Sequence, residues 1–279
     1  MVFRKNFIYF LILITFAVWL SVFSIDNQLH IVACDVGQGD AILIQKNTTQ
    51  ILIDGGPDNS VLNCLGKHMP FWDKKLELVI LTHPQEDHYG GLVDVFKNYK
   101  VNLFGEYNTE SSNQGYQVLK NIPTPLVTLS KGTKLRLGMI YLDILHPSGN
   151  NQSIINNKQT SNANDDGVVV LLKYAQFKAL FTADVENKVS DKLSELPEIQ
   201  NLNYLKVNHH GSKNGLSQKL LDTVDPEIAV ISVGKKNRYG HPHEEVIKIL
   251  GERDIKILRT DLEGDVEVVT DGISYWTKK

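Results

Sequence analysis

The sequence predicts a layered α/β fold in which strands and helices alternate. Three observations support it. Short apolar runs recur between Gly-rich turns, segments with helical spacing follow several of them, and metal-binding residue types stand directly after the apolar runs. At 279 residues the chain is long enough for one large domain with a sizeable core. Its 42% hydrophobic and 22% charged residues are ordinary for a globular protein. Its net charge of −3 argues against a protein that binds duplex nucleic acid through a broad basic surface.

The N-terminal segment, residues 1–28, is expected to be separate from the domain that follows. Arg4 and Lys5 precede an uncharged apolar run from Phe7 to Phe23, which is near the ~17 to 25 residues that span a bilayer. We expect one hydrophobic helix that anchors the protein in the cytoplasmic membrane in a single pass, with the catalytic domain extracytoplasmic. A cleaved signal peptide is the alternative and would make the protein secreted, although no clear Ala-x-Ala site is present.

Residues 29–279 are expected to form one domain, and its first half alternates strand and helix. The pattern predicts two strands within 29–44 around a Gly-rich turn, a strand at 51–53, a helix over 60–68, a buried strand over 76–81 and a helix over 91–99.

The middle and second half of the domain begin with strand-like alternation over 126–146 and a polar loop over 148–166. There follow a hairpin of 168–172 and 178–182, a strand over 202–207, a helix over 216–224, a strand over 228–233, a helix over 244–253 and strands over 255–259 and 265–269.

The two cysteines, Cys34 and Cys64, have neither zinc-knuckle nor redox-motif spacing. We expect both to be small buried hydrophobic residues. In an extracytoplasmic compartment they would pair if the fold brings them close, which their separation in sequence leaves open.

Potential metal ligands recur where predicted strands end. Loops at the carboxyl ends of strands in an α/β sheet meet at one edge, so such residues can share a site. Imidazole and carboxylate groups suit zinc, manganese or iron, and a carboxylate can bridge two ions about 3.5 to 4 Å apart. One histidine beside an aspartate is usually a solvated pair, but the joint pattern favours a shared metal site. The residues are His83, Asp87, His88, Asp184, His209, His210, His241 and His243.

Other polar residues are expected to be structural. Asp54 is interpreted as a turn carboxylate that accepts nearby backbone amides. His30, His68 and His146 lack an evident polar cluster in the sequence. Lys206, within a strand, is expected to be exposed, with phosphate contact as the alternative.

The run His83-Pro84-Gln85-Glu86-Asp87-His88-Tyr89-Gly90-Gly91 resembles the signature of the metallo-β-lactamase superfamily, which usually has a further histidine where this chain has Gln85. A finer resemblance is to the hydrolase domain of the ComEC family of competence proteins, and it covers roughly Leu29 to the C-terminus. It implies a four-layer αβ/βα sandwich, the metallo-β-lactamase fold. It also implies a metal-dependent phosphodiesterase that degrades the DNA strand that is not taken up. The motifs that carry it lie at 35–40, 53–56, 81–84, 182–186, 205–212 and 239–242.

The resemblance implies a role for each matching residue at the metals. Asp87 and His88 would bind one ion, with His209 or His210 completing it. Asp184 would be the bridging carboxylate.

The second ion would be served by His83 and Gln85. Because Gln85 is a neutral amide, this ion should be held more weakly or by oxygen-rich ligands, which favours manganese or magnesium over zinc. We therefore expect two divalent ions, manganese or zinc, with magnesium as a further candidate. Asp165 or Asp166 would supply a further oxygen ligand to this ion; the alternative is that both are only polar residues of the loop.

The expected catalytic residues are Asp87, His210 and His241. His241 would bind the scissile phosphate or protonate the leaving oxygen. His243 has a weaker case because it can equally cap the following helix.

The expected function is extracytoplasmic hydrolysis of DNA or another phosphodiester. Full-length ComEC proteins carry a membrane channel of many helices, whereas this chain has one hydrophobic segment and is not expected to form a pore itself. The expected partners are the substrate, the membrane through the N-terminal helix, and DNA-uptake channel proteins. The alternatives are a hydrolase of another phosphoester or of a lactone, and a non-catalytic DNA-binding or assembly module, which Gln85 motivates.

Overall fold

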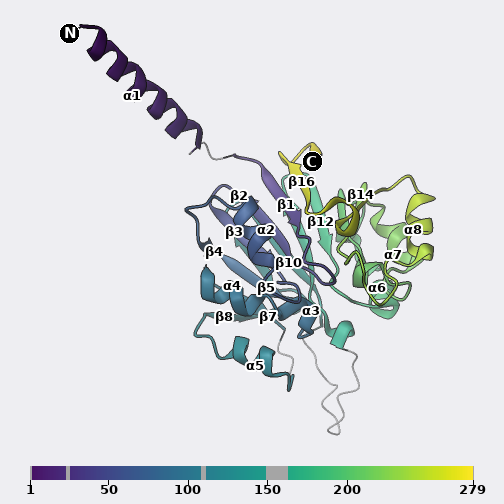
Figure 1. The fold of residues 1–279 in the computed structure, drawn as a ribbon. Coiled ribbons are helices and arrows are strands. Elements are labelled where there is room, and N and C mark those ends of the chain that lie inside the picture. Colours follow the sequence, from purple (N-terminus) through teal and green to yellow (C-terminus); the bar gives the residue numbers. More distant parts are fainter. Residues whose placement is uncertain (1, 23–25, 108–110, 149–162, 279) are drawn as a thin grey trace.

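A computed structural model describes residues 2–22, 26–107, 111–148 and 163–278 (Figure 1). Helix α1 (Val2–Val22) precedes an α/β domain, as the sequence predicts. Within the described ranges, no helix combines the length and apolar character needed to cross a membrane. Most of the predicted polar loop lies outside these ranges, and its described end is the short 3-10 helix η1 (Ala163–Asp166).

Two main sheets form the centre of the described domain. The first contains, in spatial order, β17 (Tyr275–Lys278), β16 (Val266–Thr270), β1 (Leu29–Ala33), β2 (Ile42–Lys46), β3 (Thr49–Ile53), β5 (Leu78–Leu81), β7 (Phe104–Glu106) and β8 (Leu126–Thr128). The second contains β15 (Lys256–Arg259), β14 (Ile228–Ile231), β13 (Tyr204–Lys206), β12 (Phe177–Phe181), β11 (Val169–Tyr174), β10 (Ile140–His146) and β9 (Lys134–Leu137).

Helices cover the outer faces of the two sheets (Figure 1). Residues of α2 (Val61–His68), α4 (Leu92–Asn98) and α5 (Gln114–Lys120) share one apolar cluster with the first sheet. Residues of α6 (Asn187–Leu193), α7 (Gln218–Val224) and α8 (Glu244–Gly251) share another with the second sheet. The predicted four-layer αβ/βα sandwich is therefore confirmed.

The alternation of side chains along each strand builds these layers. In β1, Ile31 lies in the core between the two sheets, whereas the next residue, Val32, packs in the cluster beneath the outer helices. Both side chains are buried, so a one-residue slip of register would exchange two packed faces.

Several elements differ from the sequence prediction. The strand expected at 76–81 is divided into β4 (Lys75–Leu76), which pairs with β6 (Lys100–Val101), and β5, which pairs with β3 and β7. β7, β17, α5 and α6 were not predicted, because they are short and their apolar residues give little periodicity. Further short helices are α3 (Glu86–Tyr89), α9 (Thr260–Glu263), η2 (Pro197–Ile199) and η3 (Asn208–Gly211).

A disulfide joins Cys34, just after β1, to Cys64 in α2, with Cα atoms 5.8 Å apart. Both residues are buried, as expected. The fold therefore answers the question of pairing that sequence separation left open.

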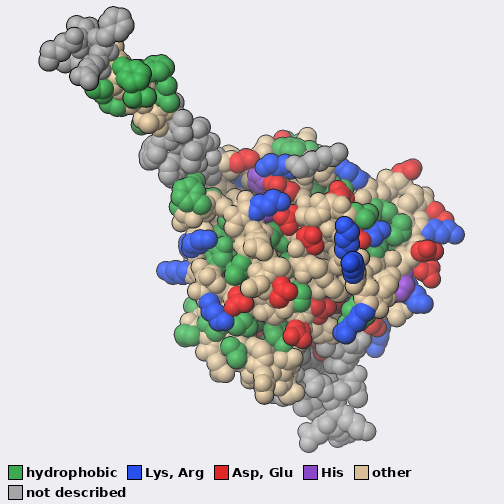
Figure 2. Space-filling view, viewed as in Figure 1, with side chains coloured by type: hydrophobic (Ala, Val, Ile, Leu, Met, Phe, Trp, Pro, Cys, Tyr) green, Lys and Arg blue, Asp and Glu red, His purple; other side chains and the backbone are tan. Residues whose placement is uncertain are grey.

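The visible surface of the domain carries charges of both signs. In the space-filling view, Lys and Arg side chains are interspersed with Asp and Glu rather than gathered by sign (Figure 2). Among the described residues on this face, charges of opposite sign alternate and no broad field of one sign is present.

Candidate metal centre

Four described side chains converge where loops follow strands of both sheets. They come from α3, from the loop after β12 and from η3 after β13, and each offers a ligand atom within 4.8 Å of the others. Asp184 Oδ2 lies 3.4 Å from His88 Nε2 and 3.3 Å from His210 Nε2. His210 Nε2 lies 3.6 Å from Asp87 Oδ2. The predicted convergence of Asp87, His88, Asp184 and His210 is thus present in the fold.

The donor set fits a divalent cation. Among the described residues, the buried atoms His88 Nε2, His210 Nε2 and Asp184 Oδ1 have no hydrogen-bond partner. Leaving such atoms buried and unpartnered costs about 1–3 kcal/mol each, or more where the group is charged. Imidazole nitrogens and carboxylate oxygens that face one another at these distances would be satisfied together by a metal ion.

Asp54 orients His88 towards the cluster. Asp54 Oδ2 accepts hydrogen bonds from His88 Nδ1 at 2.8 Å and from the Thr82 hydroxyl at 2.7 Å. Its Oδ1 accepts from the backbone N–H of Thr82 at 2.8 Å. The interpretation of Asp54 as a local turn carboxylate is wrong: it holds the ring of His88 so that Nε2 faces the site.

The His209–His210 turn places a second imidazole. His210 Nδ1 donates to the carbonyl oxygen of Ser232 at 2.9 Å, which leaves Nε2 for the cluster. His209 and His210 have φ angles of 47° and 53°, in the left-handed region that non-glycine residues seldom adopt. The turn therefore holds strained backbone where it presents ligands.

His83 and His209 flank the four converging residues. The ring of His83 lies 4.1 Å from that of His88, and its Nε2 is a buried atom without a partner among the described residues. His209 Nε2 lies 3.8 Å from Asp184 Oδ2, farther than the corresponding atom of His210. The geometry thus favours His210 over His209 as the residue that would bind the same ion as Asp87 and His88.

Gln85 contacts a residue that sequence reasoning missed. Its Nε2 donates to Oδ1 of Asn164, a buried residue of η1. The neighbouring Asp165 and Asp166 join no cluster of metal-binding groups in the described part of the chain. The backbone oxygen of Asp165 instead accepts from His146 Nε2 at 2.6 Å, so His146 has a polar partner.

Asp40 and Lys206 form a buried ion pair beside the cluster. Lys206 is 1% exposed and pairs with Asp40 Oδ2, and its Nζ lies 3.9 Å from Asp184 Oδ1. The expectation that Lys206 is exposed is wrong, because its strand is buried on both faces. Asp40 is the last residue of the motif at 35–40, and nothing in the sequence shows that its side chain is buried.

The glycine pair after His88 allows another loop to pack against the motif. A Cβ at Gly91 would lie 2.1 Å from the carbonyl oxygen of Gly55, and one at Gly90 would lie 2.1 Å from that of Pro57. The backbone N–H of Gly55 also donates to the carbonyl oxygen of His88 at 2.7 Å. The signature is therefore held by close backbone contact as well as by side chains.

In the protein without metal, the carboxylates of the site stabilise the protonated histidines, and the histidines stabilise the ionised carboxylates. Burial favours neutral His88, but the Asp184 and Asp54 carboxylates outweigh it and raise the pKa of His88 well above its ordinary value. Burial likewise opposes ionisation of Asp184, but His210 and His88 outweigh it and hold the pKa of Asp184 well below its ordinary value. Divalent cations would replace the protons on these histidines.

The pKa values of His210, His83 and Asp87 are also shifted, upwards for His210 and downwards for the other two. Although burial acts to lower it, Asp184 and Asp40 raise the pKa of His210 to about 9. Burial, with His88 next, lowers the pKa of His83 to about 3. Burial opposes ionisation of Asp87, but the nearby ring of His210 and the charge of His88 outweigh it and lower the pKa of Asp87 to about 2.

His241 borders the cluster. Its ring lies 5.6 Å from the ring of His209 and 6.5 Å from that of His210. Burial, followed by the charges of His210 and His209, lowers the pKa of His241 to about 4. His243 precedes α8, yet its side chain makes no capping hydrogen bond within the described residues, and its Nδ1 accepts from the backbone N–H of Lys213 at 3.2 Å.

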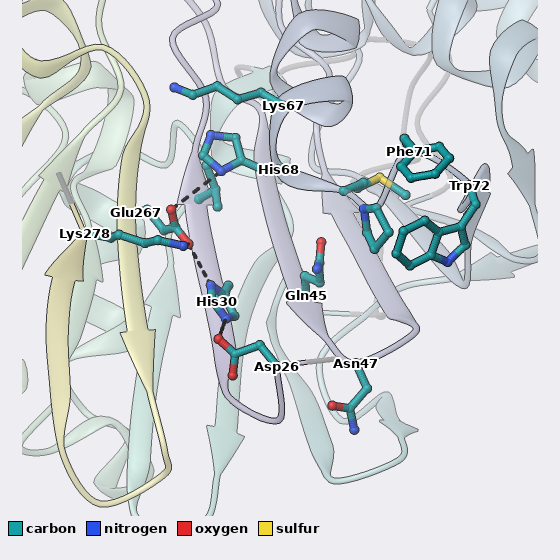
Figure 3. A pocket seen from close by; sticks show the side chains of 13 residues that line it. Asp26, His30, Gln45, Asn47, Lys67, His68, Phe71, Trp72, Glu267 and Lys278 are labelled. Carbon is teal, nitrogen blue, oxygen red and sulfur yellow. Dashed lines mark hydrogen bonds and ion pairs between the residues drawn. The ribbon is translucent and has the colours of Figure 1, made fainter. Parts of the chain in front are cut away.

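His30 and His68 lie at a separate cavity of about 380 Å³ (Figure 3). His30 Nδ1 lies 2.7 Å from Glu267 Oε1, and His68 Nε2 lies 3.0 Å from Asp265 Oδ2. The expectation that both histidines lack a polar cluster is wrong. The residues that line this cavity include none of the four converging side chains.

The sequence matches known proteins over part or most of its length. A sequence model of the metallo-beta-lactamase superfamily matches residues 34–114. ComE operon protein 3 of Bacillus subtilis is 26% identical over 256 residues, which cover 84% of this chain and 32% of that protein. Recombination protein 2 of Haemophilus influenzae is 28% identical over 240 residues, which cover 84% of this chain and 28% of that protein. The chain thus spans about a third of the length of these relatives.

Solved structures share the fold. The metallo-beta-lactamase fold protein YhfI from Bacillus subtilis has a TM-score of 0.57 and 13% identity, with 90% of this chain and 100% of that chain covered. A diphosphatase from the PhnP family has a TM-score of 0.52 and 12% identity, with 87% of this chain and 98% of that chain covered. The chain therefore has the metallo-β-lactamase fold, and over most of its length it is similar to one part of the ComEC-like competence proteins.

Proposed function

We propose that this chain is a metal-dependent phosphodiesterase that cleaves DNA. The observation that carries the proposal is the group of Asp87, His88, Asp184 and His210, whose ligand atoms lie within 4.8 Å of one another. Among the described residues, His88 Nε2, His210 Nε2 and Asp184 Oδ1 are buried there without a hydrogen-bond partner. The similarity to competence proteins supports DNA as the substrate class. The diphosphatase of the same fold supports phosphoester chemistry only as a fold-level analogy.

The ions that this group would hold are manganese or zinc, with magnesium as a further candidate. Bound there, divalent ions would polarise a phosphoryl oxygen and make water a stronger acid near neutral pH. His88 and His210 would hold the first ion with Asp87, and Asp184 would reach both positions. His83, with Gln85 as a weaker donor, would serve the second position, which favours ions that accept oxygen ligands.

The side chains of the chain itself would orient the substrate. Asp54 and the carbonyl oxygen of Ser232 fix His88 and His210, so the ligands are pre-organised rather than gathered on binding. His241 stands at the border of the cluster with a buried Nδ1 that has no partner in the described ranges. With its low pKa, His241 is neutral at pH 7, which suits a hydrogen bond to a phosphate oxygen better than donation of a proton in the metal-free protein.

We place this activity outside the cytoplasm, at the membrane or in secreted form. The buried Cys34–Cys64 disulfide supports an oxidising compartment. The apolar N-terminal sequence supports membrane targeting. The proposed partners are channel proteins of DNA uptake, as the resemblance to the ComEC family implies; the matched segment is about a third of the length of the relatives.

The experiment is a comparison of fragment release from single- and double-stranded DNA with added manganese, zinc or magnesium. Asp87→Ala and Asp184→Ala should each abolish release, whereas Asp191→Ala, on the exposed face of α6, should not change it. Unchanged cleavage by the Asp87 and Asp184 variants would refute the site. Parallel assays with phosphocholine esters and lactones would identify a different hydrolase if DNA is untouched.

A further inference from the structure

The loop after β14 presents an aromatic residue at the edge of the metal centre. Tyr239 is 50% exposed, and its ring stacks on that of His241 with a centroid distance of 5.7 Å and an angle of 24° between the planes. The ring of His241 in turn lies 5.6 Å from that of His209. The ring of His241 also lies 6.5 Å from that of His210, so one imidazole ring separates Tyr239 from the converging residues of the candidate metal centre.

Asn237 fixes the conformation of this loop. Its Nδ2 donates to the carbonyl oxygens of Gly234 at 2.9 Å and His241 at 2.7 Å. Its Oδ1 accepts from the backbone N–H of His241 at 2.9 Å and that of Tyr239 at 3.2 Å. Since one amide ties both ends and the middle of the loop, Tyr239 and His241 are held in a fixed relation.

A guanidinium lies over the exposed ring, and further cations belong to the same loop or to the turn beside it. The guanidinium of Arg238 lies 5.2 Å over the ring of Tyr239, and its Nη2 donates to the Tyr239 hydroxyl at 3.0 Å. Lys235 and Lys236 are exposed residues of the same loop. Lys213 is also exposed, and its backbone N–H donates to Nδ1 of His243, two residues after His241. In the described part of the chain, none of these four cations lies within 4 Å of a carboxylate.

The arrangement of ring and cations matches the chemistry of one nucleotide in a single strand. An unpaired base offers a flat π-face for stacking on tyrosine and arginine, while its phosphates seek cations. In a duplex both faces of an internal base are already stacked. A ring-free phosphoester or lactone has no group that would use Tyr239.

We propose that Tyr239, with Arg238, is a base-stacking subsite that selects single-stranded nucleic acid. This inference rests on the proposed phosphodiesterase function and specifies its substrate. Because His241 stacks on Tyr239 and the guanidinium of Arg238 lies over the same ring, a base would stack on the Tyr239–Arg238 pair, with its adjoining phosphate towards His241 and the candidate metal centre. Tyr239 is thus a specificity-determining residue that acts through substrate position.

The test compares two oligomers that share a phosphate backbone. Binding of fluorescein-labelled single-stranded oligothymidine and of an abasic oligomer of equal length is measured by fluorescence anisotropy in chelator, for wild type, Tyr239→Ala and Tyr239→Phe. Tyr239→Ala should weaken oligothymidine binding by about 5- to 150-fold, the loss expected for one base–aromatic stack, and should leave abasic binding unchanged. Tyr239→Phe should bind like wild type, as should Phe71→Ala, which removes an exposed aromatic ring at the separate cavity.

Hydrolysis with added manganese separates the two proposals. Tyr239→Ala should raise KM for oligothymidine far more than it lowers kcat. If wild type cleaves neither oligomer while the binding difference persists, the phosphodiesterase proposal fails and the stacking subsite stands. If Tyr239→Ala affects both oligomers equally, or affects neither, the subsite is refuted whether or not the protein cleaves DNA.

Discussion

His88 and Asp54 form a buried pair in which His88 Nδ1 lies 2.8 Å from Asp54 Oδ2. This contact makes Asp54 the outer partner of a metal-facing imidazole, a position whose loss typically costs about 10- to 100-fold in metal affinity. Asp54→Ala should therefore weaken metal binding by about that factor. Competition with a chromophoric chelator measures it, with Asp191→Ala as the exposed aspartate control. Equal affinities in Asp54→Ala and wild type would show that the pair does not orient the ligand.

The glycine after the signature makes a steric prediction. In Gly91→Ala the new methyl would lie 2.1 Å from one backbone oxygen and 2.2 Å from another, neither of which can move cheaply. We expect a loss of unfolding free energy of at least about 1–3 kcal/mol. Urea denaturation measures it. The matched control is Gly66→Ala in α2, where a methyl meets no described atom within 4 Å and should be neutral or mildly stabilising. Equal effects of the two substitutions would contradict the packing of the motif.

The metal-free protein should lose stability as pH rises through the alkaline range. His88 and His210 have folded pKa values above the ordinary 6.5, so their stabilisation is fully present below about pH 6.5 and is lost as pH rises through the pKa of about 9 of His210. His83 and His241, with pKa values of about 3 and 4, are neutral throughout this window.

Thermal or urea unfolding in chelator between pH 6.5 and 9 measures this slope. His210→Asn should flatten it, and saturating metal should remove it because the ion replaces the protons. A metal-free stability that stays level or increases over this window would contradict the assigned charge state of the cluster.

The disulfide should contribute substantially to stability. It closes a loop with a sequence separation of 30, for which the chain-entropy relation gives about 3–4 kcal/mol. Cys34→Ser with Cys64→Ser should lower the unfolding free energy by about that amount, and added reductant should lower it in wild type but not in the double variant. Equal unfolding free energies in non-reduced wild type and in the double variant would contradict a stabilising disulfide.

The convergence of His83, Asp87, His88, Asp184 and His210 could be predicted from the sequence because each follows an apolar run, and strand ends meet at one edge of a sheet. Gly-rich turns and helical spacing likewise predicted most strands and helices. Such patterns indicate which segments form strands and helices. Combined with the topology of an α/β sheet, they also indicate where the strand ends meet.

The sequence could not predict the partners that lie behind the ligands. Asp54 stands 34 residues from His88, and Asp40 stands 166 residues from Lys206. Whether a carboxylate serves a turn or a distant imidazole, and whether a lysine is buried, depends on packing between the two sheets. Asn164 escaped notice for the same reason: it follows a polar stretch and becomes visible only through its contact with Gln85.

The most direct test of the metal centre is the metal content of protein purified without added metal, measured with DNA cleavage on the same sample. Wild type and Asp191→Ala should contain manganese or zinc and cleave DNA. Asp184→Ala should lose both the metal and the cleavage, because it removes the carboxylate that faces both His88 and His210. Equal metal content and equal cleavage in Asp184→Ala and wild type would contradict the proposed centre.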